Sequence, residues 1–291
     1  MKLIERFREG KFVLTCEVGP PKGIEVRKLI DQMQPLRGKI DAFNVTDLQS
    51  SVLRVGSMAM CRLLKEEGLE PIMQLTCRDR NRLGLQSDVL SAAVLGIENL
   101  LCLTGDHPNL GDHPGAMPVF DLDSVQLLAG VKGLMAGKDM AGNELEGRFP
   151  QFCLGAAVNP GAEPLEPQIM KMEKKIAAGA EFFQTQAVYE VDKFAAFREK
   201  VRHLKAPVMA GLVLLKSAGM ARFMNANVAG IHVPDGIINA LAAVEKEKRV
   251  QKSLEIAAGL VKELKGLCEG VHIMSLGWER HVPKLLEMCG L

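Results

Sequence analysis

The chain has 291 residues, of which 47% are hydrophobic and 24% charged, and its formal net charge at pH 7 is +1. This composition supplies ample apolar material for a folded core and excludes a disordered chain. Basic and acidic residues are interleaved, so the sequence lacks the charged footprint that nucleic acids or anionic membranes require.

The chain contains no targeting or metal-binding pattern. Its first eight residues are amphipathic, but they carry too many charges for a signal peptide, and no stretch approaches the ~18 apolar residues that span a bilayer. Seven cysteines are scattered without a C-x-x-C pair, and six histidines are too dispersed for a metal site. We therefore expect a cytoplasmic protein with no membrane insertion and no metal centre of its own.

Eight short apolar runs, each closed by a turn or polar residue, are typical of buried strands. They span 12–18, 40–47, 71–77, 99–104, 152–158, 182–188, 208–215 and 271–276. Segments with helical periodicity span 24–35, 51–67, 86–96, 122–137, 165–178, 190–203, 217–226, 235–265 and 279–289. Gly68, Gly96 and Gly179 occupy expected helix C-cap positions. The alternation predicts parallel β–α units.

Eight strands alternating with helices in a chain of this length predict an α/β fold, the (β/α)8 TIM barrel, as one domain over 1–291. A doubly wound sheet would usually have fewer strands. The active site of such a barrel lies at the C-terminal ends of the strands. We therefore expect active-site loops at 105–118 and 159–164, and a surface excursion at 137–150.

Polar side chains follow most of the predicted strands and should surround one mouth. They are Glu17, Thr46, Asp47, Thr76, Arg78, Asp106, His107, Asn159, Gln186, Tyr189, Lys216 and Trp278. This set offers carboxylates, an amide and a lysine. It contains no Ser–His–Asp order, no metal-ligand spacing and no Walker loop.

Two carboxylates are the candidates for acid–base chemistry. Glu17 is held at a strand end because Pro20 and Pro21 follow it closely and exclude a helix. A general acid there requires partial burial, which raises a carboxyl pKa, whereas the alternative is a pairing with lysine or a loop cap. Asp106 could equally cap the loop after Gly105.

Over about residues 11–277 the chain resembles the 5,10-methylenetetrahydrofolate reductase family, whose members are flavin-bearing TIM barrels. The resemblance rests on short motifs at matching strands. They are Glu17-Val18-Gly19-Pro20-Pro21, Leu75-Thr76-Cys77, Leu103-Thr104-Gly105-Asp106, Ala178-Gly179-Ala180 and Thr185-Gln186. Each motif is weak alone, and their order along the chain makes the set specific.

The resemblance implies a reduction of 5,10-methylenetetrahydrofolate to 5-methyltetrahydrofolate, with hydride from N5 of reduced flavin. Glu17 would be the general acid that opens the five-membered ring, and Asp106 would favour the cationic iminium. Gln186 and Leu276 would contact the substrate. FAD is the implied cofactor, with FMN left open. The implied flavin contacts are Thr46, Gln74, Asp106, Phe120, Asp121 and Lys175.

The chain departs from the family pattern where flavin and nicotinamide would bind. Family residues are replaced by Thr104, Gln74, Val158, Ala218 and Trp278. The nicotinamide contact is therefore the least transferable implication. Electrons could come from NAD(P)H or from a metal-cluster-bearing partner subunit, and we expect an oligomer or a hetero-complex.

Two other functions compete with this hypothesis. A flavin-free barrel lyase or methyltransferase that binds a pterin would be colourless, and it would leave Lys175 and the loop at 105–121 without a role. A non-catalytic scaffold subunit of a larger complex would have no use for Glu17, Asp106 and Gln186 together.

Overall fold

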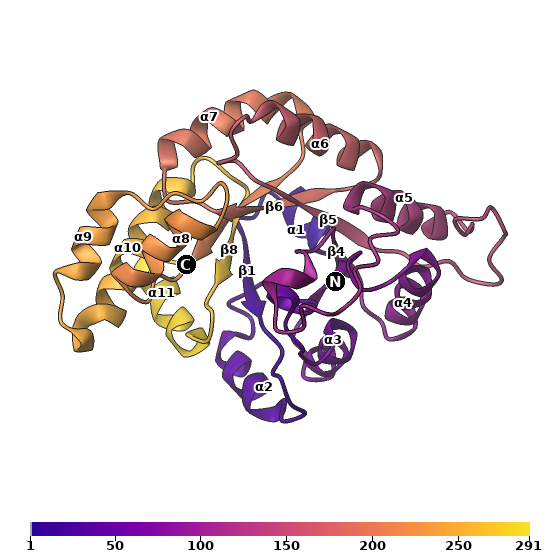
Figure 1. The fold of residues 1–291 in the computed structure, drawn as a ribbon, viewed down its shortest axis with the longest axis horizontal. Helices are drawn as coiled ribbons and strands as arrows, with labels where there is room; N and C mark the ends of the chain where they lie inside the picture. The colour runs from indigo at the N-terminus through magenta and orange to yellow at the C-terminus, as the bar shows by residue number, and fades with distance from the viewer. Residues whose placement is uncertain (1) are drawn as a thin grey trace.

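The computed structural model describes residues 2–291, and its eight parallel strands close into a barrel in chain order (Figure 1). The strands are β1 (Val13–Val18), β2 (Ala42–Val45), β3 (Pro71–Thr76), β4 (Asn99–Leu103), β5 (Cys153–Val158), β6 (Phe182–Ala187), β7 (Val208–Val213) and β8 (Gly270–Met274). Strand β8 closes the ring by pairing with β1, where Cys16 lies opposite Ile273. The predicted TIM barrel and its eight strands are confirmed.

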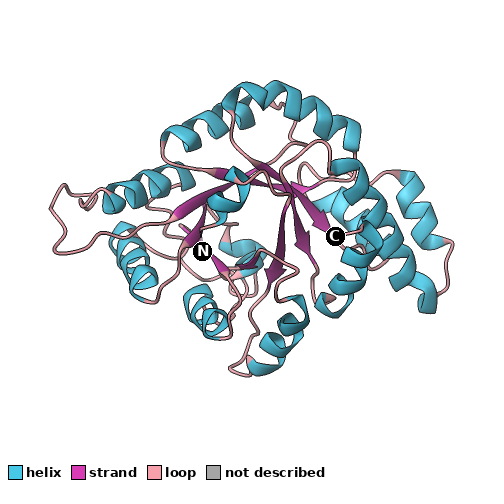
Figure 2. Cartoon of the chain, turned by 180° about the vertical axis from the view of Figure 1, so that it is seen from behind, coloured by secondary structure: helices cyan, strands magenta, loops and turns pink. Residues whose placement is uncertain are grey.

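Helices surround the strands on all sides, as Figure 2 shows from behind. They are α1 (Leu3–Arg8), α2 (Arg27–Met33), α3 (Ser57–Glu66), α4 (Arg82–Val94), α5 (Ser124–Met135), α6 (Glu166–Ala177), α7 (Val191–Val201), α8 (Ala218–Asn227), α9 (Asp235–Ala242), α10 (Arg249–Leu264) and α11 (Val282–Cys289). The loop between α5 and β5 extends beyond the ring of helices, as predicted for 137–150 (Figure 1).

Three helix predictions need correction. The helix predicted over 235–265 is two helices, α9 and α10, because the backbone at Glu245 is extended (ψ 156°) before a short 3-10 turn. The helix predicted from residue 51 begins at Ser57, since Ser50 and Ser51 adopt left-handed φ values of 55° and 56°. Helix α1 was not predicted as a helix. The expected C-cap glycines do have positive φ.

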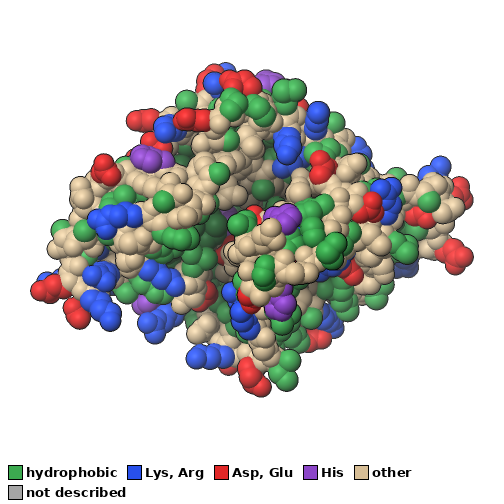
Figure 3. Space-filling view, viewed as in Figure 1, with side chains coloured by type: hydrophobic (Ala, Val, Ile, Leu, Met, Phe, Trp, Pro, Cys, Tyr) green, Lys and Arg blue, Asp and Glu red, His purple; other side chains and the backbone are tan. Residues whose placement is uncertain are grey.

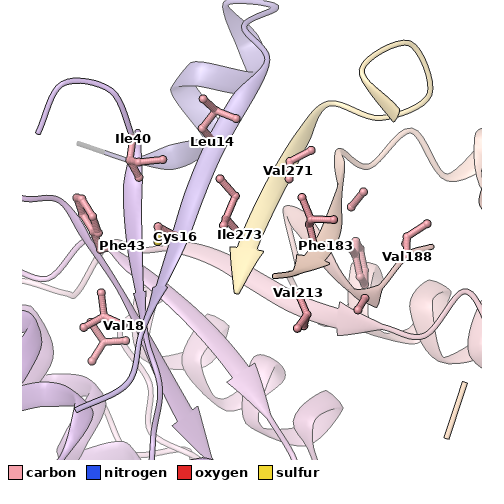
Figure 4. Packing of buried hydrophobic residues seen from close by; sticks show 14 of the residues in the cluster. Leu14, Cys16, Val18, Ile40, Phe43, Phe183, Val188, Val213, Val271 and Ile273 are labelled. Atoms are coloured by element: carbon pink, nitrogen blue, oxygen red, sulfur yellow. The ribbon is translucent and has the colours of Figure 1, made fainter. Parts of the chain in front are cut away.

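The alternation of side chains along each strand separates an outer core from the barrel interior. On β1, Leu14, Cys16 and Val18 face outward and pack in the core under the helices (Figure 4). Val13 faces inward, into a second cluster made of Leu3, Ile4, Val13, Ala42, Ile72, Leu101, Cys153, Phe182 and Met209. Because Glu17 lies four residues after Val13, the same alternation directs its side chain into the barrel mouth.

No helix within residues 2–291 is both long and apolar enough to cross a membrane.

Candidate active site

A cavity of about 340 Å³ opens at the C-terminal ends of the strands. Figure 3 shows this face of the molecule hollowed near its centre. Seven of the predicted site and mouth residues line the cavity: Glu17, Asp47, Gln74, Thr76, Arg78, Asp106 and Gln186. The structure thus brings together side chains from β1, β3, β6 and the loop after β4.

The cavity floor is a layer of polar side chains inside the barrel. Asn44 donates from Nδ2 to Oε1 of Gln184 at 2.6 Å, and Gln184 donates from Nε2 to Oγ1 of Thr15 at 3.4 Å. Thr15 Oγ1 lies 2.9 Å from Nδ1 of His272, whose pKa burial lowers to about 4, so this imidazole is neutral. The buried Oδ1 of Asn44 has no hydrogen-bond partner.

Glu17 is the buried acid of the site. Its side chain is 7% exposed, and burial raises its pKa to about 7, with a further upward contribution from the charge of Glu279. The hydrogen bond from Gln49 Nε2 to Glu17 Oε1, 3.1 Å long, and the charge of Arg54 oppose this rise. Glu17 therefore meets an amide rather than a lysine, and it exchanges its proton near neutral pH.

Asp106 and Gln186 present exposed side chains to the cavity. Within residues 2–291 the Asp106 carboxylate accepts no hydrogen bond, so it does not cap its loop. Its backbone carbonyl accepts a hydrogen bond from Arg78 Nη1 at 3.3 Å. Gly105 has a φ of +92°, and a Cβ there would lie 3.3 Å from Cβ of Thr76, so glycine suits this close turn.

Two of the predicted flavin contacts, Thr46 and Lys175, do not line the cavity, and their side chains donate hydrogen bonds to backbone carbonyls. Thr46 is buried, and its hydroxyl donates to the carbonyl of Val18 at 3.5 Å. Lys175 donates from Nζ to the carbonyl of Ala157 at 2.6 Å, and burial lowers its pKa to about 8.

The other two, Phe120 and Asp121, lie in the loop before α5. Phe120 stacks on His107, with 6.3 Å between ring centroids. Asp121 accepts hydrogen bonds from the Arg82 backbone and guanidinium, which lower its pKa to about 2. These contacts hold the loop and the start of α4, and the flavin roles of all four residues stay predictions.

A second cavity of about 440 Å³ lies beside the mouth and shares Glu17 and Gln49 with it. Arg54, Leu276 and Glu279 are among its other lining residues. The candidate substrate contact Leu276 therefore lines the second cavity, and Glu17 lies between the two spaces.

The predicted active-site loop after β4 is fastened to the loops after β1 and β2. Asp112 pairs with Lys22 and accepts a hydrogen bond from the backbone of Leu53 at 3.2 Å. Lys22 and the other donors hold the pKa of Asp112 well below its usual range. Gly111 packs so closely that a Cβ would lie 1.8 Å from the carbonyl oxygen of Ser51.

Asp47, another acid at a strand end, has a structural role. It accepts hydrogen bonds from the Thr76 backbone at 3.0 Å and hydroxyl at 2.9 Å, and it pairs with Arg80. We expect Asp47→Asn to destabilise the fold by about 1–3 kcal/mol, because a fully buried acceptor loses its charge. Urea unfolding measures this, and Asp121→Asn, in an exposed pair, should cost less. Equal losses in both variants would contradict it.

Several residues of the site were not among the sequence candidates: Asn44, Gln49, Arg54, Gln184, His272 and Glu279. For Asn44 and Gln184 a signal existed, since each lies two positions before a chosen strand-end residue and so faces the same side of its strand. Gln49, Arg54 and Glu279 belong to irregular segments, where no periodicity points inward.

The chain is similar to proteins of one enzyme family over most of its length. The sequence model of the family described as Methylenetetrahydrofolate reductase matches residues 2–290. Methylenetetrahydrofolate reductase 2 of Schizosaccharomyces pombe is 25% identical over 99% of this chain and 47% of its own length. The 5,10-methylenetetrahydrofolate reductase of Pectobacterium carotovorum is 23% identical over 88% of this chain and 82% of its own. This chain thus spans about half of the yeast relative and most of the bacterial one.

Solved structures share the fold. A Clostridium thermocellum protein described as binding two copies of 5-methyl-5,6,7,8-tetrahydrofolic acid superposes with a TM-score of 0.62 at 17% identity, covering 99% of this chain and 97% of that one. The EDTA monooxygenase of Chelativorans sp. BNC1 gives 0.58 at 13% identity, with coverages of 96% and 93%. The family match over nearly the whole sequence shows that this chain belongs to the methylenetetrahydrofolate reductase family.

Proposed function

We propose that residues 1–291 form one flavin-binding catalytic domain that reduces 5,10-methylenetetrahydrofolate to 5-methyltetrahydrofolate. The observation that carries the proposal is Glu17, a buried carboxyl with a pKa of about 7, facing a cavity that Asp106 and Gln186 also line. Family membership supports the same reaction. So does the folate ligand of the Clostridium thermocellum protein, which has the same fold.

The cavity suits the ring of a flavin. Its floor carries the amides of Asn44, Gln74 and Gln184, whose donors and acceptors match the polar edge of such a ring. Gln74 and Asp106 would hold the ring in this space. The bound cofactor, proposed as FAD, would supply the hydride.

Three side chains of this chain perform the remaining chemistry. Glu17 donates its proton to the ring nitrogen of the folate as the C–N bond of the five-membered ring breaks. The Asp106 carboxylate favours the cationic iminium that results, and Gln186 hydrogen-bonds the pterin edge. After hydride reaches the methylene carbon, Glu17 takes a proton from water, so one hydride and one proton are consumed per methyl group formed.

An absorption spectrum of the purified protein tests the proposal, followed by anaerobic addition of 5-methyltetrahydrofolate. We expect a flavin spectrum that the methylfolate bleaches, because this ligand runs the half-reaction in reverse. A colourless protein that flavin cannot reconstitute would instead favour the flavin-free pterin enzyme. A flavin that no folate bleaches would favour the scaffold subunit.

The electron donor is a separate proposal. Trp278, which replaces a family arginine, is packed against His281 with 5.6 Å between ring centroids, and Lys216 Nζ lies 5.7 Å from the Trp278 ring. The replacement of family residues by Ala218 and Trp278, rather than these contacts, supports reduction by a metal-cluster-bearing partner subunit in a hetero-complex over direct reduction by NAD(P)H. Fast bleaching of the isolated chain by NADH or NADPH would contradict this.

A further inference from the structure

Glu279 begins the 3-10 turn that follows β8 and lines the second cavity, and no reaction step above uses it. Its side chain is 6% exposed. One of its oxygens, Oε1, accepts two hydrogen bonds of 2.8 Å, from Ser275 Oγ and from the backbone of Gly277. These two bonds fix the position of that oxygen beside the second cavity.

Glu279 and Glu17 line the same cavity of about 440 Å³. The strand of Glu17, β1, pairs with β8, which ends five residues before Glu279, and Cys16, the neighbour of Glu17, lies opposite Ile273. Within residues 2–291 no lysine, arginine or histidine forms an ion pair with Glu279. Two negative charges that line one cavity without an ion-pair partner repel each other.

We propose that Glu279 is a positioning residue for Glu17, a fixed negative charge across their shared cavity that keeps the single proton of the pair on Glu17. The inference rests on the proposed function, in which Glu17 donates that proton. It assigns the second cavity a part in catalysis, because Glu17 can be reprotonated from this side while substrate fills the mouth.

Other charges that face Glu17 come from each neighbouring element. Arg54, from the loop after β2, opposes Glu279; its Nη1 donates to the Pro20 carbonyl at 2.9 Å, and its buried Nε has no partner. The remaining titratable groups nearby are Cys16, Asp47, Arg78, Asp106 and His272. Asp47 pairs with Arg80 and Arg78 pairs with Asp79, while His272 and Cys16 are neutral because burial disfavours their charged forms.

The proposal predicts opposite effects of the two charges on the pH profile. In single-turnover reoxidation of the reduced enzyme by 5,10-methylenetetrahydrofolate, the rate should fall above the pH at which Glu17 ionises. Glu279→Gln can keep both hydrogen bonds and removes the charge. We therefore expect the alkaline fall in rate, called here the alkaline limb, to move to lower pH by about one unit. At a fixed pH above the limb, the variant should then react about tenfold more slowly. Arg54→Gln should move the limb upward.

A second readout needs no cofactor. Carbon-13 NMR of glutamate-labelled protein follows the Glu17 carboxyl, which Glu17→Gln identifies by its absence, and Glu279→Gln should lower its titration midpoint. Glu287→Gln, an exposed glutamate on α11, is the matched control and should leave the profile in place.

An unmoved limb and an unmoved NMR midpoint in folded Glu279→Gln would overturn the inference. If that variant does not fold, Glu279→Ser replaces it: this change removes the same charge, so the alkaline fall in rate should again move to lower pH, and an unmoved profile would overturn the inference equally. If the wild-type protein does not reoxidise with the folate, the proposed function is overturned. The NMR comparison would still test whether the charge of Glu279 acts on Glu17.

Discussion

Replacing Glu17 with glutamine should slow folate reduction by about 10²–10⁴-fold, the usual contribution of a positioned general acid. Glutamine fits the same space and keeps an acceptor for Gln49, whose amide lies 3.1 Å from Glu17, but it cannot release a proton. Stopped-flow reoxidation of the reduced flavin by 5,10-methylenetetrahydrofolate measures the loss.

Reduction of the flavin is the internal control for this variant, because Glu17 has no part in that step. Glu146→Gln, in the exposed loop before β5, is the matched control and should retain the wild-type rate in both half-reactions. Loss of both half-reactions in Glu17→Gln would indicate a damaged site, and retention of both would remove Glu17 from the mechanism.

The same substitution should stabilise the fold at alkaline pH. Burial raises the Glu17 pKa from 4.5 to about 7, so the folded state holds the proton more tightly than the unfolded chain. Wild-type stability is thus lost as pH rises from about 4.5 to 7, and glutamine avoids this loss. We expect Glu17→Gln to gain on the order of 2–3 kcal/mol at pH 8 and little at pH 4. Urea unfolding at both pH values checks the sign.

Phe182→Ala should destabilise the protein by about 3–5 kcal/mol. The ring is fully buried in the lower interior of the barrel, where it contacts Phe7 from α1 at 5.9 Å between centroids. It also fills the space over Gly155, where a Cβ would lie 2.3 Å from the ring. The cavity left by alanine could not close, because the surrounding strands are fixed in a closed ring.

Urea unfolding of Phe182→Ala against Phe223→Ala isolates the effect of burial. Phe223 on α8 is 62% exposed, so its replacement should change stability by no more than about 0.5 kcal/mol. A loss below 1 kcal/mol for Phe182→Ala would show that the interior cluster can repack around α1.

The sequence alone determined the barrel. Short apolar runs separated by helical periods define parallel β–α units, and each of the eight strands lies where its run predicts it. Local patterns failed where the backbone departs from regular geometry. The left-handed Ser50 and Ser51 delay α3, and the extended backbone at Glu245 divides α9 from α10. The resemblance to the family could also be found from the sequence, since each of its motifs is a short run of consecutive residues.

Only the tertiary structure decided how the site is assembled. Glu17 could be chosen as an acid from its strand end, but its raised pKa comes from burial and from Glu279, 262 positions later in the chain. The second cavity and the contacts of Gln49 and Arg54 belong to irregular segments, whose positions no periodicity encodes. The local sequence determines where each strand ends. Closure of the barrel determines which charged side chains, from distant parts of the chain, lie close to those ends.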